Sequence, residues 1–98
     1  MKSYIYNYTW MDLEALDVFI DSFWSEIISP LDPNRQVSAS FSCIYKDFIW
    51  MSRPIIINND HQSLHYLKSS ILSGSLASRL RMNEAEGGIK CYIQYVVI

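Results

Sequence analysis

The sequence predicts one α+β domain, residues 1–98, from two hydrophobic patterns with different periods. From Val37 to Tyr45, every second residue is apolar and most residues between them are serines. This alternation predicts a strand with one buried face. From Leu13 to Ile27, apolar residues recur at three- and four-residue spacing, which predicts an amphipathic helix. The composition, 50% hydrophobic and 18% charged, is typical of a globular protein.

The first half of the chain is predicted as strand, helix and strand. Ser3–Trp10 alternates aromatic residues with other residues and predicts the first strand. Asp12 is placed to cap a helix that we expect to end near Ser29, because Pro30 cannot continue it. Val37–Tyr45 is the second strand.

The next segment is predicted as a hairpin. Lys46-Asp47 is the expected turn, and Phe48–Arg53 returns as a strand within the largely apolar stretch Phe48–Ile57. Pro54 has no N–H to donate to a sheet, so we expect a bulge or an edge at that point.

The last part of the chain is predicted as helix and strand. Asp60 is the expected N-cap of helical structure in residues 61–86, and Ser73-Gly74-Ser75 leaves open whether this is one helix or two. Gly87-Gly88 ends it, and Ile89–Ile98 is the final strand.

The order βαββαβ predicts a ferredoxin-like fold, a four-stranded antiparallel sheet with two helices on one face. Another α+β sandwich with the same element order is the alternative. In the predicted arrangement the C-terminal strand lies at a sheet edge, and both of its faces become apolar toward its end. We therefore expect this strand either to form a homodimer or to accept a strand from a partner.

Acidic residues gather on one side of the first predicted helix. Glu14, Asp17 and Asp21 share that side, and residues 12–29 contain five acids and no base. No lysine within the segment relieves their repulsion. The pattern predicts a contact surface for a basic protein, and an ordinary solvated face is the alternative.

Aromatic residues form a second candidate surface. Tyr4, Tyr6, Tyr8 and Trp10 alternate along the first strand, and they are expected either to pack under the helices or to line the open sheet face with Phe48 and Trp50. On an open face these rings would contact a protein or stack on bases. Residues 46–51 resemble the third-strand motif of RNA-recognition modules, although Asp47 stands where that motif has glycine.

Catalytic and metal-binding patterns are weak in this chain. His61 and His65 share a helix face with no third ligand nearby, so we expect no bound metal, no cofactor and no catalytic residues. Cys43 and Cys91 are expected to be free buried thiols. Because the chain also shows neither a signal peptide nor a long apolar run, we expect a cytoplasmic protein without membrane contact.

In general character the chain resembles bacterial immunity proteins of contact-dependent growth inhibition systems. The shared traits are one compact domain, an acidic patch, candidate exposed aromatics and no complete catalytic motif. The resemblance implies a small inhibitor that binds a cognate toxin, with a basic nuclease as the expected partner. The alternatives are a nucleic-acid-binding module that uses open-face aromatics and a small ferredoxin-like dimeric enzyme.

Overall fold

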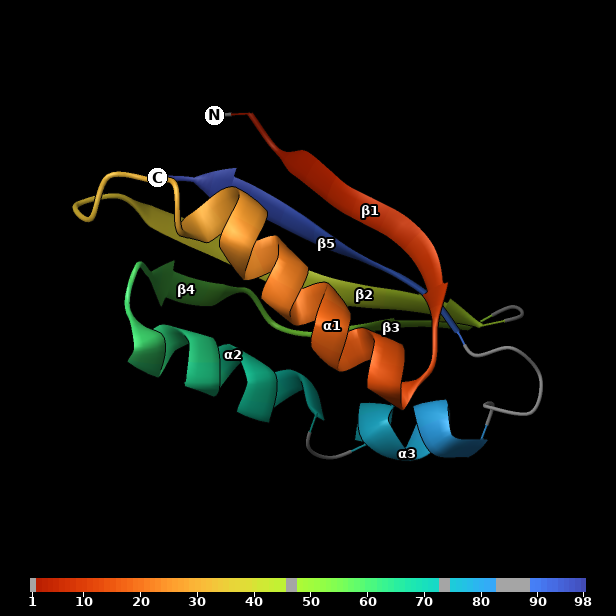
Figure 1. Ribbon diagram of the computed structural model, residues 1–98. Helices are drawn as coiled ribbons and strands as arrows, with labels where there is room; N and C mark the ends of the chain where they lie inside the picture. The colour runs from red at the N-terminus through yellow and green to blue at the C-terminus, as the bar shows by residue number, and fades with distance from the viewer. Residues whose placement is uncertain (1, 46–47, 73–74, 83–88) are drawn as a thin grey trace.

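The structure, a computed structural model, describes residues 2–45, 48–72, 75–82 and 89–98. It has two layers, an antiparallel sheet and a layer of helices that covers one side of it (Figure 1). In chain order the elements are β1 (Tyr4–Met11), α1 (Leu13–Phe23), the π-helix η1 (Trp24–Ile28), β2 (Gln36–Tyr45), β3 (Phe48–Met51), β4 (Ile55–Asn58), α2 (His61–Leu72), α3 (Ser75–Met82) and β5 (Ile89–Val97). The predicted α+β class is confirmed.

The sheet has five strands in four rows. The rows follow the order β1-β5-β2-β3, and β4 also pairs with β2, so that β3 and β4 share the last row. The row is broken before Pro54, as the sequence predicts. Ser52 keeps the break attached to β2, because its N–H donates to the Phe41 carbonyl and its Oγ accepts from the Phe41 N–H at 2.8 Å.

The ferredoxin-like four-stranded arrangement is not confirmed, and the expected edge position of the C-terminal strand is wrong. β5 lies between β1 and β2 and is antiparallel to both. The edges of the sheet are β1 on one side and the β3–β4 row on the other. The physical signal was present in the sequence, because a strand that is apolar on both faces is typical of the middle of a sheet.

The helices begin where their capping residues predict. The Ala15 N–H donates to Asp12 Oδ1 at 2.8 Å, and the Ser63 N–H donates to Asp60 Oδ1 at 2.7 Å. The question left open for residues 61–86 is answered by two separate helices, α2 and α3. The predicted turn at 46–47 and the glycine stop at 87–88 lie outside the described residues.

An aromatic cluster joins the two layers. Tyr6 of β1 packs against Phe19 and Phe23 of α1, with ring centroids 5.4 and 5.3 Å apart. Phe19 also contacts Phe41 of β2, and Phe23 contacts Tyr95 of β5. The apolar stripe of α1 therefore meets three adjacent strands, which fixes the helix across the middle of the sheet.

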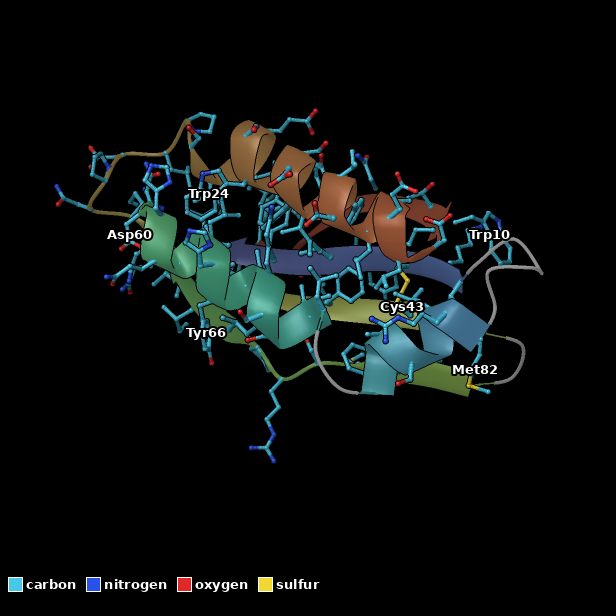
Figure 2. All side chains as sticks on the ribbon, turned by 60° about the horizontal axis from the view of Figure 1, so that its bottom comes forward. Trp10, Trp24, Cys43, Asp60, Tyr66 and Met82 are labelled. Carbon is cyan, nitrogen blue, oxygen red and sulfur yellow. A yellow bond between two sulfur atoms is a disulfide. The ribbon has the colours of Figure 1, made fainter. Side chains whose placement is uncertain are left out.

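Cys43 and Cys91 form a disulfide, so the expectation of free thiols is wrong. They are cross-strand partners of β2 and β5, with their Cα atoms 4.0 Å apart. Both are buried on the side that the helices cover, where Figure 2 shows the bond between the sheet and the helices. Their separation of 48 residues in the sequence gave no sign of this pairing.

A β-bulge changes the direction of the β1 side chains. Tyr6 pairs with Ile93 and Thr9 with Cys91, so that two residues, Asn7 and residue 8, oppose one residue of β5. Asn7 has φ 37°, in the left-handed region. Asparagine tolerates this conformation better than other side-chain-bearing residues, which suits it to the first position of such a bulge.

Removal of the disulfide is expected to destabilise the fold strongly. The bond closes a loop across 48 residues of chain, so the chain-entropy estimate for its loss is about 4 kcal/mol in the free energy of unfolding. Denaturant titrations of wild type and of Cys43→Ala/Cys91→Ala measure this loss. Reduced wild type is the control, because it lacks the bond but keeps both sulfur atoms. Equal unfolding midpoints for oxidised and reduced wild type would contradict the bond.

The bulge reverses the order of stability expected for glycine and alanine at position 7. Asn7→Gly is expected to be more stable than Asn7→Ala by about 1 kcal/mol, because only alanine has a Cβ that clashes at positive φ. In a regular strand glycine is instead the less stable residue by roughly 0.5–1 kcal/mol. Both variants lose the Asn7 side chain and its hydrogen bond to Tyr6, so their difference isolates the backbone. An alanine variant as stable as the glycine variant in denaturant titrations argues against the bulge.

Candidate functional site

Two of the three acids on the candidate acidic surface have a basic partner inside the chain. Lys68 of α2 lies 2.7 Å from Asp21 and 3.4 Å from Asp17. The hydrogen bond to Asp21 is the main reason that the pKa of Lys68 is raised. The absence of a base within residues 12–29 therefore does not mean an uncompensated face, because the base comes from the neighbouring helix.

The remaining acids of this segment have structural positions as well. Asp12 caps α1, and Glu26 accepts a hydrogen bond from the Tyr6 hydroxyl. Glu14 is exposed in the first turn of α1, where a negative charge interacts favourably with the helix dipole. Two of the three acids of the predicted acidic surface therefore contact α2, while their side chains remain about half exposed and Glu14 is exposed.

The bulge at Asn7 divides the predicted aromatic stripe between the two sides of the sheet. Tyr6 is buried under α1, and Tyr4 stacks on Tyr95 with centroids 5.4 Å apart on the same side. Trp10, beyond the bulge, pairs with Lys90 on the opposite side and is 60% exposed. The side chain of Tyr8 lies outside the described part of the chain.

Trp50 is also on the helix side rather than with Trp10. It pairs across the sheet with the buried Cys43 and packs edge-on against Phe41, with centroids 6.5 Å apart. The structure therefore does not bring the predicted aromatic residues into one surface.

The side of the sheet without helices carries a different set of residues, which we call the sheet face. They alternate with the buried residues of each strand and are linked by cross-strand pairing. The sheet face consists of Ile5 and Trp10 of β1, Lys90, Tyr92, Gln94 and Val96 of β5, Ser38, Ser40, Ser42 and Ile44 of β2, and Ile49, Met51 and Ile56 of β3 and β4.

Large apolar side chains are exposed along both edges of the sheet face. Ile5 and Trp10 are 63% and 60% exposed on β1, and Ile49, Met51 and Ile56 are 61%, 59% and 51% exposed on β3 and β4. Scattered apolar residues are ordinary on protein surfaces, but a set gathered on one uncovered face marks a contact surface.

The middle of the sheet face combines the small side chains of β2 with the larger ones of β5. β2 contributes the predicted serines, of which Ser42 is fully buried and its Oγ finds no hydrogen-bond partner among the described residues. The five described strands contain no acid, and Lys90 is their one base. The sheet face is therefore apolar at its edges and mixed in its centre, where Lys90 is the one charged residue, and it is free of carboxylates in the described strands.

Sequence reasoning missed Ile5, Ile49, Met51 and Ile56. The available signal was Ile55-Ile56-Ile57. Consecutive residues of a strand point to opposite sides of the sheet, so at least one of these isoleucines had to point away from the helices. Ile56 is that side chain, since its pairing partner is Ser38 and its neighbour Ile57 is buried.

The two histidines lie on one helix. His61 and His65 are both exposed on α2. Within residues 2–45, 48–72, 75–82 and 89–98, no three His, Cys, Asp or Glu side chains are grouped so that they could hold a metal ion.

The buried Tyr6 hydroxyl predicts a loss of stability at alkaline pH. Burial, together with the hydrogen bond to Glu26, raises the pKa of Tyr6 from 10.0 to about 12. Because folding favours the protonated phenol, the resulting stabilisation is complete below pH 10 and is lost as the pH rises toward 12. We expect Tyr6→Phe to lose less stability than wild type over this interval in denaturant titrations. Tyr66→Phe, on the exposed side of α2, is the control, and equal losses in all three proteins would contradict the assignment.

Comparison of the chain with protein-family models, with curated proteins and with solved structures gave no match in any of the three searches.

Proposed function

We propose that the chain is a protein-binding module whose contact surface is the sheet face. The observation that carries this proposal is the set of five large apolar side chains, each more than half exposed, on a sheet side without helices. Burial of such side chains is the main source of affinity in protein interfaces, and tryptophan is enriched among the residues that dominate it.

A protein partner is favoured over a nucleic acid by the charge of this surface. Phosphate binding needs several bases, and the strands contribute Lys90 alone. Base stacking also needs aromatic rings on the open face, and Trp50 and Tyr6 lie on the helix side, which leaves Trp10 and Tyr92. Trp10 beside Lys90 is the feature that a nucleic acid would still use.

An immunity-type inhibitor is one example of a protein-binding module. We propose it only from the general character of the chain, which is a small domain with an acidic patch and no complete catalytic motif. The acids on α1 support it less than the sequence suggests, because Lys68 pairs with two of them and offsets part of their negative charge. The cytoplasmic location expected from free thiols also loses that support, since structural disulfides persist mainly in oxidising compartments. Within the described ranges no helix has the length and apolarity needed to cross a membrane.

Site-directed photo-crosslinking tests the proposed function. A benzophenone amino acid replaces Ile49 on the sheet face or, as the matched control, Val18 on α1, which is equally exposed at 62%. In the cells that produce the chain, we expect a protein adduct from position 49 and none from position 18. Equal yields from both positions, or no adduct at 49, would refute the proposed surface. A nucleic-acid adduct at 49 would instead favour the alternative.

A further inference from the structure

We infer that the partner of the sheet face is a second copy of this chain. Two copies pack sheet against sheet around a two-fold axis that runs parallel to the strands, midway between β5 and β2. This inference rests on the proposed function, because it names the partner of the same surface.

The rows in the centre of the sheet face complement each other under this axis. Since the rows follow the order β1-β5-β2-β3, the rotation places β5 of one copy over β2 of the other. The face of β5 presents the larger side chains Tyr92, Gln94 and Val96. These residues pair across the sheet with Ser42, Ser40 and Ser38. Gln94 and Val96 therefore meet the partly exposed Ser40 and Ser38 of the second copy at the same level, while Ser42 is already buried within its own copy.

The outer rows complement each other as well. Trp10 pairs with Lys90, Lys90 with Ile44, and Ile44 with Ile49, so all four residues lie at one level of the sheet. The rotation brings Trp10 of one copy over Ile49 of the other. Each exposed side chain then covers the other, and symmetry repeats the contact at the opposite edge. The strands of two packed sheets cross at an angle of about 30°. Facing residues of the two copies are therefore displaced least near the axis and more toward the edges of the sheet.

The charge distribution permits this contact despite a net charge of −2 for each copy. The acids of α1 lie on the helix side, and the molecule is 20 Å deep along its shortest dimension. Two copies joined by their sheet faces therefore keep these acids farther apart than the Debye length of about 10 Å at 0.1 M salt.

The area of the sheet face is sufficient for a stable dimer. The nine residues of β5 extend ~30 Å, and four rows of strands span ~19 Å. One face therefore covers roughly 600 Å² in projection. Two copies would bury about 1,200 Å² or more, above the ~1,000 Å² expected of a specific interface.

Sedimentation equilibrium of the purified full chain tests the dimer. Ser40 lies next to the inferred axis on the uncovered side, so Ser40→Lys adds two facing charges without entering the core. We expect this variant to raise the dimer dissociation constant ~10-fold or more, while Val18→Lys on α1 leaves it unchanged. Circular dichroism establishes that both variants are folded. A monomeric wild type, or a dimer that Ser40→Lys does not weaken, would overturn the inference.

Disulfide trapping tests the orientation of the two copies. Trp10→Cys and Ile49→Cys are prepared as separate single variants, because the two native cysteines are already bonded to each other. Oxidation of their mixture should yield the mixed covalent dimer, and each variant alone should yield little. Efficient self-linking of either variant alone would overturn the inferred axis. A monomeric protein that photo-crosslinks a different protein from position 49 would overturn self-pairing but leave the proposed function intact.

Discussion

The register between β2 and β5 is the constraint on which the rest of the structure depends. The disulfide between Cys43 and Cys91 holds two directly paired residues of these central strands. Since side chains alternate from face to face along a strand, a shift by one residue would exchange the buried and uncovered sides of the sheet. If β5 shifted, the buried Ile93 would become uncovered; if β2 shifted, Phe41 would become uncovered and the central serines would face α1. This register therefore sets both the core and the sheet face.

Local patterns predicted the elements of this chain well. The strand around Val37–Tyr45, the caps Asp12 and Asp60 and the interruption before Pro54 all depend on neighbouring residues, and the structure confirms them. Strand order depends on pairing between distant segments, which periodicity does not encode. The same limit hid the disulfide and the contact of Lys68 with the acids of α1, because each joins residues far apart in the sequence.

The candidate surfaces changed for two physical reasons. Asn7 adds one residue to β1, and this single bulge separates Trp10 from Tyr6, which two-residue spacing had placed together. Lys68 converts an apparently repulsive set of acids into a contact between α1 and α2. The surface that we propose for binding is then the uncovered side of the sheet, where β1 and the β3–β4 row expose isoleucine, methionine and tryptophan. The acids of α1 thus lie on the helix side, and the described strands of the sheet contain no acid.

The central claim is the position and register of β5 between β1 and β2. Nuclear Overhauser effects between backbone protons measure both, because directly paired residues of antiparallel strands lie close together. The structure predicts that Cys91 shows cross-strand effects to Thr9 on one side and to Cys43 on the other. Effects to only one of these strands, or pairing of Cys43 with Tyr92 in place of Cys91, would contradict the fold and the sheet face derived from it.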